Sequence, residues 1–228
     1  MNAKAQPLAI DLHFEEDGAQ IFADALDNAA CLAIEQAIAD LPSDVPGVRI
    51  GFAPALRAML AVDGPVGGIA ASALGPEARA VLFDKTAARN WALGWHQDRT
   101  IVVEQRADIE GFGPWTVKAG LIQVEPPFAI LERMVTIRVH IDPIDATNAP
   151  LRVVPGSHRL GRLTEASIKY VVEDRGEREC LAKRGDVWLY ATPIIHGSRA
   201  ADPPRRRRVL QVDYAAADLP SPLRWRGL

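Results

Sequence analysis

Short apolar or alternating runs dominate the chain from residue 80 onward, and this feature restricts the possible folds more than any other. Residues such as Gly, Pro, Asn and Asp separate neighbouring runs, which is the pattern of strands joined by turns. The runs cover residues 80–83, 100–103, 134–141, 151–154, 187–190 and 209–214. They predict an antiparallel β-barrel or sandwich for this part of the chain.

The chain before residue 80 has a helical period instead. Apolar residues recur at three- and four-residue spacing over residues 27–41, and Asp27 or Asn28 is placed to cap the start of that helix. Shorter helices are predicted over residues 54–62 and 65–80, the second of them interrupted by a Gly-Pro pair.

Length and composition fit one globular domain of 228 residues, of which 48% are apolar and 24% are charged. We expect this domain to span residues 1–228, with a mainly helical part at 1–80 and a β-core at 81–215. The two cysteines, Cys31 and Cys180, are too few for a disulfide framework or a Cys-rich zinc site.

Charge and hydropathy also exclude classes of partner. A net charge of −3 lacks the broad basic footprint of a nucleic-acid-binding protein. No apolar run approaches the ~18 residues needed to span a membrane, and the first residues lack the apolar core of a secretory signal. We therefore expect a cytoplasmic protein without a nucleic-acid or membrane partner, and the sequence does not indicate its oligomeric state.

A long segment, residues 104–132, contains several Gly and Pro residues and no clear periodic pattern. An irregular loop of this length in a compact domain is usually functional and is often a lid over a site. Its aromatic residues Phe112 and Trp115 are candidates to close over a substrate, and equally good candidates to anchor the loop by packing.

Two of the five histidines begin an HxD triplet, His96-Gln97-Asp98 and His140-Ile141-Asp142. Residues i and i+2 of a strand project from the same face, so either triplet can direct an imidazole and a carboxylate at one point. One further histidine would complete the two-imidazole, one-carboxylate set of non-haem Fe(II) oxygenases, which leaves open positions on the metal.

The surroundings of the histidines favour the first triplet. His140 lies in an alternating strand and is expected on the side of that strand away from the core, while His158 lies in a turn and His13 in the acidic N-terminal segment. The third ligand is best sought where a strand ends near a loop, because sites occur at the mouth of a barrel. His196 has that position.

An arginine run, residues 205–208, leads into the last strand. Strand alternation turns Arg205 and Arg207 to one face and Arg206 and Arg208 to the other. Such a run usually forms a solvated basic edge, but one inward arginine near a metal could bind a carboxylate through two parallel hydrogen bonds.

Several segments together resemble the phytanoyl-CoA dioxygenase family of Fe(II)- and 2-oxoglutarate-dependent oxygenases. The segments are Phe83-Asp84-Lys85, residues 90–98, residues 148–158, Gly161, Gly185-Asp186-Val187, His196-Gly197-Ser198 and the arginine run, in the family's order. The resemblance implies an α+β fold, a double-stranded β-helix (a jelly-roll, cupin-like barrel) with N-terminal helices packed outside. It also implies bound Fe(II), 2-oxoglutarate as co-substrate and O2.

The same resemblance assigns roles to residues of this chain. It implies that His96, Asp98 and His196 bind iron, with no catalytic residue beyond this metal centre. It implies that Arg207, eleven residues after the distal histidine, and Ser198, two residues after it, hold the distal carboxylate of 2-oxoglutarate. Further co-substrate contacts are expected from Lys85 and Arg138, and substrate contacts from Trp91, Gln97, Phe112 and Trp115.

One turn departs from the family's pattern. Relatives commonly have Asn-Gly where this chain has Asn148-Ala149. An alanine is expected to avoid the positive φ that glycine permits, so the local turn should differ.

The sequence leaves three functions open. The first is hydroxylation of an unactivated C–H bond in a small-molecule or acyl substrate, with release of succinate and CO2. The second is a non-catalytic barrel that binds a ligand, and the third is a zinc-dependent hydrolase that uses the same three ligands. The third gives no role to Ser198 or Arg207, and the substrate itself cannot be deduced.

Overall fold

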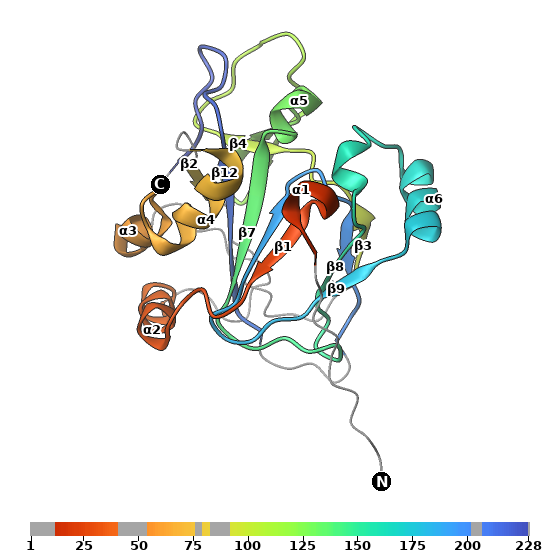
Figure 1. Cartoon of the computed structure of the whole chain (residues 1–228). Coiled ribbons are helices and arrows are strands. Elements are labelled where there is room, and N and C mark those ends of the chain that lie inside the picture. Colours follow the sequence, from red (N-terminus) through yellow and green to blue (C-terminus); the bar gives the residue numbers. More distant parts are fainter. Residues whose placement is uncertain (1–11, 41–53, 76–78, 83–91, 202–206, 228) are drawn as a thin grey trace.

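Three antiparallel sheets form the centre of the molecule in a computed structural model, which describes residues 12–40, 54–75, 79–82, 92–201 and 207–227. The five-stranded sheet has the order β1-β10-β7-β12-β2, the four-stranded sheet β3-β11-β8-β9, and the three-stranded sheet β4-β6-β5 (Figure 1). The strands are β1 Ala19–Phe22, β2 Arg79–Leu82, β3 Leu93–His96, β4 Ile101–Val103, β5 Trp115–Lys118, β6 Leu121–Val124, β7 Met134–His140, β8 Leu151–Val153, β9 Arg178–Cys180, β10 Val187–Ala191, β11 His196–Ser198 and β12 Val209–Ala215.

The five-stranded and four-stranded sheets pack face to face through a buried cluster that includes Trp188 and Tyr190 of β10 and Leu151 and Val153 of β8. Two antiparallel sheets in this arrangement, with helices outside, form the double-stranded β-helix that was expected. The six strands that the sequence predicted are all present, as β2, β4, β7, β8, β10 and β12, each within two residues of its expected bounds.

Helices cover the outer face of the five-stranded sheet (Figure 1). Asp27 caps α2 by accepting a hydrogen bond from the backbone N–H of Ala30, which confirms one of the two predicted caps. Apolar side chains of α2 and α4 pack on Val135, Ile137 and Val139 of β7. The helical elements are α1 Phe14–Asp17, α2 Asn28–Ala37, the 3-10 turn Pro54–Leu56, α3 Arg57–Leu60, α4 Pro65–Leu74, α5 Phe128–Leu131, the 3-10 turn Ser157–Arg159 and α6 Glu165–Arg175.

This packing gives β7 the opposite orientation to a strand in a simple sandwich, whose apolar face would point between the two sheets. Its apolar residues face the helices outside, so the alternate residues Thr136 and Arg138 face the other way, into the space between the two sheets. The barrel interior therefore receives polar side chains from β7, and this is the surface that positions the site.

Two features differ from the expectation. The segment before residue 80 supplies a strand as well as helices, because β1 pairs with β10 at the edge of the five-stranded sheet. The prediction of an irregular loop over residues 104–132 is wrong. This segment contains the β5–β6 hairpin and α5, and β6 pairs with β4.

An ion-pair network joins α2 to the ends of β7 and β12. The Glu35 carboxylate lies 2.9 Å from Nη1 of Arg184 and 2.7 Å from Nη2 of Arg208, and Arg208 also lies 2.7 Å from Asp142. The hydrogen bond from Arg184 is the main reason that the pKa of Glu35 lies below its ordinary value.

We expect Glu35→Gln to lower the midpoint of thermal unfolding by about 2–4 °C at neutral pH, since a partly exposed network contributes little more than a single ion pair. Because the folded-state pKa of Glu35 is lowered, its contribution is complete above the unfolded value of 4.5 and is lost as pH falls through the folded value. The difference between the two proteins in thermal melts should therefore shrink as pH falls below 4.5. A difference that grows in acid would contradict this role for Glu35.

Within the described ranges, no helix has both the length and the apolar character needed to cross a membrane.

Candidate metal and co-substrate site

The three predicted metal ligands come together at the end of the four-stranded sheet. The β3–β11 register places His196 directly opposite His96, so both imidazoles lie on one face of the sheet. Asp98 follows β3 by two residues. Its carboxylate oxygens lie 3.8 Å from Nε2 of His96 and 3.7 Å from Nε2 of His196. One ligand atom from each of the three residues lies within 4.8 Å of the other two.

Hydrogen bonds to the backbone fix the tautomer of both histidines. Nδ1 of His96 lies 2.8 Å from the carbonyl oxygen of Gly94, and Nδ1 of His196 lies 2.9 Å from that of Ile194. A carbonyl oxygen only accepts, so each Nδ1 carries a proton, and in the neutral ring each Nε2 keeps its lone pair. This is the arrangement of histidines that bind a metal through Nε2.

The three ligands differ in burial. His196 is buried, whereas His96 and Asp98 are partly exposed, so the group is closed on one side and open on the other. Two imidazoles and one carboxylate on one side of an ion leave positions for further ligands, and this donor set suits Fe(II). The residues present therefore fit a catalytic rather than a closed structural metal site.

Behind the metal group, polar side chains line the barrel interior. The ring centroid of Tyr190 lies 5.7 Å from that of His196, and the hydroxyl of Tyr190 lies beside Arg138. Arg138 donates a 3.0 Å hydrogen bond to Oε1 of Gln211, its cross-strand neighbour on β12. A path of polar groups thus leads from His196 into the barrel.

Arg207 and Arg208 lie on opposite sides of the chain, as the alternation predicted. Arg208 points outward to Asp142 and Glu35. Nη1 of Arg207 instead donates to the carbonyl oxygens of Asn148, at 3.0 Å, and of Ala149. Burial, together with the positive charge of Arg138, lowers the pKa of Arg207 to about 10, so its guanidinium is still charged at neutral pH.

Neither interior guanidinium has an anionic partner in the part of the chain that the structure describes. No described carboxylate lies within 4.0 Å of the guanidinium nitrogens of Arg138 or Arg207. Two partly buried positive charges without a counter-ion among the described residues are unfavourable, and an anionic ligand would offset that cost. The barrel interior around Arg138 and Arg207 is therefore suited to bind a carboxylate group of a ligand.

The expectation for the Asn148-Ala149 turn is wrong. Ala149 adopts φ of +49°, the left-handed conformation that glycine takes more easily. The turn is kept despite the alanine, and its two carbonyl oxygens hold Arg207. The chain therefore accepts a strained residue at the point that orients this arginine.

We expect Ala149→Gly to leave the free energy of unfolding unchanged or to raise it by up to about 1 kcal/mol, because glycine removes the left-handed penalty at some entropic cost. Ala149→Val should lower it by about 1–2 kcal/mol, since a β-branched residue is worse at positive φ. Urea unfolding measures both values. The matched control is Ala119→Gly, at φ of +50° in the β5–β6 turn. A clear fall in the free energy of unfolding for Ala149→Gly but not for Ala119→Gly would contradict the conclusion that Ala149 is strained.

His140 lies where the sequence did not place it. The prediction that it faces away from the core is wrong, because His140 is 1% exposed. Burial first, and then the charges of Arg138 and Arg207, lower the pKa of His140 to about 3, so its ring is neutral. The alternation of Arg138 and His140 on one face of β7 was the signal that could have identified it.

The remaining predicted site residues have varied surroundings. Gln97 is buried, and its side-chain amide bonds the backbone of Gly161, Pro193 and Leu163. Phe112 and Trp115 are partly buried and pack against the cluster around β4 and β6. Ser198 follows His196 by two residues on β11. Two predicted residues, Lys85 and Trp91, lie outside the described residues.

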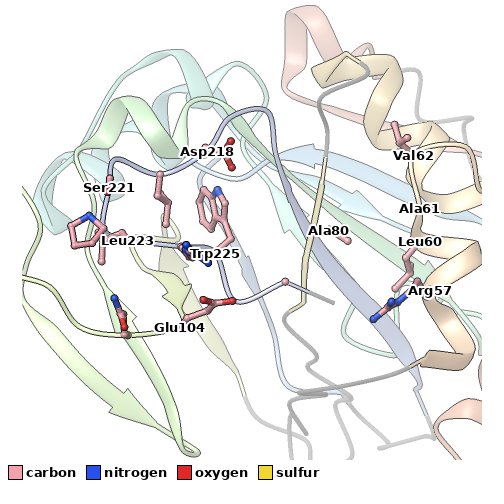
Figure 2. A pocket seen from close by; sticks show the side chains of 15 residues that line it. Arg57, Leu60, Ala61, Val62, Ala80, Glu104, Asp218, Ser221, Leu223 and Trp225 are labelled. Carbon is pink, nitrogen blue, oxygen red and sulfur yellow. The ribbon is translucent and has the colours of Figure 1, made fainter.

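Two other features involve residues outside the predicted site. The ring of His158 packs on Gly18, where a Cβ would meet it at 2.2 Å. A surface hollow of about 1120 Å³ lies between α3 and the C-terminal segment, lined by residues that include Arg57, Glu104 and Trp225 (Figure 2). None of its lining residues belongs to the predicted site.

A family model for phytanoyl-CoA dioxygenase (PhyH) matches residues 14–209, a span that contains His96, Asp98 and His196 as well as Arg138, Tyr190 and Arg207. The chain belongs to the phytanoyl-CoA dioxygenase family. None of the curated protein sequences matches it significantly.

Solved structures support the fold of this family member. The apo form of EctD from S. alaskensis superposes with a TM-score of 0.66 at 21% identity, over 92% of this chain and 77% of that one. AviO1 from Streptomyces viridochromogenes Tue57 gives 0.63 at 19% identity, over 92% and 95%. HygX from Streptomyces hygroscopicus, solved with nickel and 2-oxoglutarate bound, gives 0.58 at 16% identity, over 89% and 84%.

Proposed function

We propose that this chain is an Fe(II)- and 2-oxoglutarate-dependent oxygenase that hydroxylates an unactivated C–H bond of a small molecule, acting as a single domain. The observation that carries the proposal is the His96, Asp98 and His196 group, with both Nδ1 atoms bonded to backbone carbonyl oxygens, in a member of the phytanoyl-CoA dioxygenase family. The structural relative HygX has been solved with nickel, 2-oxoglutarate and hygromycin B bound, which supports a small-molecule substrate.

Each residue has a defined task in this proposal. His96, Asp98 and His196 hold one face of the ion, and the carbonyl oxygens of Gly94 and Ile194 keep the two imidazoles oriented. Bound iron supplies the oxidative chemistry, in which O2 and 2-oxoglutarate yield succinate and CO2 while one oxygen atom enters the substrate C–H bond.

The interior residues bind the co-substrate in the same proposal. Arg207 pairs with the distal carboxylate of 2-oxoglutarate through its guanidinium, and Ser198 donates a hydrogen bond to that carboxylate. Arg138 and Lys85 add positive charge to the same pocket. Trp91, Gln97, Phe112 and Trp115 remain candidates for the substrate side, where Gln97 also holds backbone segments together.

Succinate formation tests the function. Purified protein incubated with Fe(II), ascorbate, O2 and 2-oxoglutarate should produce succinate slowly without substrate and faster with a substrate from a small-molecule panel. His96→Ala should produce none. Wild-type protein that binds neither Fe(II) nor 2-oxoglutarate would overturn the proposal, and activity restored by zinc alone would favour a hydrolase instead.

A further inference from the structure

His140 ends β7 inside the barrel, and both of its ring nitrogens are buried without a hydrogen-bond partner among the described residues. A buried donor or acceptor left unpaired costs about 1–3 kcal/mol, so such groups normally have a partner, from a ligand if not from the protein. The role of His140 is not explained by the metal site, because the ring is not among the three grouped ligands.

Further unpaired atoms belong to the residues around His140. Nε of Arg138, two residues earlier on the same face of β7, is buried without a partner. So is Oδ1 of Asn148, whose backbone carbonyl oxygen accepts from Arg207. Val209, the cross-strand partner of His140 on β12, follows Arg207 by two residues. The unpaired atoms thus belong to Arg138 itself and to two residues whose neighbours are Arg138 and Arg207, the guanidiniums that have no described carboxylate beside them.

The hydrogen-bonding groups of Arg138, Arg207 and His140 favour an anionic ligand. Arg138 and Arg207 offer only N–H donors, and a neutral imidazole offers one N–H donor and one acceptor. A carboxylate accepts several hydrogen bonds at once, so it can satisfy both guanidiniums and the imidazole N–H. Burial first, and then the charges of both arginines, lower the pKa of His140 and keep its ring neutral, which preserves its acceptor nitrogen for a water molecule or for an N–H donor.

We propose that His140 binds the distal carboxylate of 2-oxoglutarate by donating a ring N–H hydrogen bond to it, beside Arg138 and Arg207. This inference rests on the proposed function and adds to it a co-substrate-binding residue that the resemblance does not supply. It also explains why a neutral imidazole lies in an interior that would otherwise be more stable with an apolar residue.

Calorimetric titration of the Ni(II)-loaded protein tests this role without turnover. The two probes are 2-oxoglutarate and 2-oxopentanoate, which has the same carbon chain with a methyl group in place of the distal carboxylate. His140→Leu should weaken 2-oxoglutarate binding by about tenfold or more, as expected for a hydrogen bond to a charged group. It should leave 2-oxopentanoate binding unchanged. His140→Gln, which keeps an N–H donor, should bind 2-oxoglutarate within about threefold of wild type.

The control is His158→Leu, which removes a histidine that packs on Gly18 and is not among the predicted metal or co-substrate residues, and it should bind both probes as wild type does. Thermal melts of the ligand-free proteins give a second readout, in which His140→Leu should be at least as stable as wild type.

Each contrary outcome has a distinct meaning. Equal affinity of wild type and His140→Leu for 2-oxoglutarate would overturn the inference alone. Equal losses for both probes, or a less stable ligand-free His140→Leu, would assign His140 a structural role and also overturn it. Wild-type protein that binds Ni(II) but not 2-oxoglutarate would overturn the proposed function itself.

Discussion

Replacing Asp98 with alanine is expected to weaken metal binding by at least ~100-fold and to abolish iron-dependent succinate formation. Among the described residues, Asp98 is the carboxylate grouped with both imidazoles, at 3.8 and 3.7 Å from their Nε2 atoms. Removal of a hydrogen-bond partner behind a metal ligand already costs 10–100-fold in many sites, so loss of a ligand itself should cost more. Anaerobic titration with Fe(II) and metal analysis of the purified protein measure the effect.

The second HxD triplet offers a matched control for this variant. Asp142 follows His140 as Asp98 follows His96, but its carboxylate binds Arg208 on the outer side of the barrel. Asp142→Ala should therefore lower thermal stability and leave metal affinity unchanged. If Asp142→Ala lost metal and Asp98→Ala kept it, the assignment of the triplets would be reversed.

Replacing Arg207 with glutamine is expected to weaken 2-oxoglutarate binding by about 100-fold or more. Truncating one partner of a buried, hydrogen-bonded charge pair commonly costs 2–5 kcal/mol, which corresponds to about 30-fold to several thousand-fold in affinity. The carbonyl oxygens of Asn148 and Ala149 orient the guanidinium, so the loss should exceed that for a flexible surface arginine. Calorimetry on the Ni(II)-loaded protein measures it.

Arg208 is the natural comparison because it is the next residue and faces outward. Arg208→Gln breaks the contacts with Glu35 and Asp142 and should reduce thermal stability while 2-oxoglutarate affinity stays at the wild-type value. Arg207→Lys should recover only part of the affinity, because an ammonium cannot form two parallel hydrogen bonds with a carboxylate. Unchanged affinity in Arg207→Gln would remove this residue from the co-substrate site.

The strands that alternate over several residues were predictable because one face of each is apolar. Alternation did not reveal the short elements. β1 has only four residues, which are too few positions to show a period. The β5–β6 turn uses Ala119 and Gly120 at positive φ in place of the Asn-Gly pair that signals such hairpins, so the segment resembled an irregular loop.

The grouping of His96, Asp98 and His196 was predictable for a different reason, since the HxD spacing is a local sequence feature and the distal histidine follows the end of a predicted strand. His140 was not, because the usual assumption places the polar face of a strand in solvent. In this fold helices cover the apolar face of β7, and the polar face with Arg138 and His140 lines the interior. The assumption is reversed when helices are predicted to pack on an alternating strand, because its apolar face then contacts the helices and its polar face points into the barrel.

The register that pairs His96 with His196 has a kinetic consequence. The two strands are far apart in sequence, so the metal group exists only after a long stretch of chain has closed on itself, and such closures are entropically costly and slow. An ion held by both strands binds the closed state and not the open chain, so it acts as a removable crosslink between two neighbouring strands of the four-stranded sheet. Loss of the metal would then loosen the same strands that carry the chemistry.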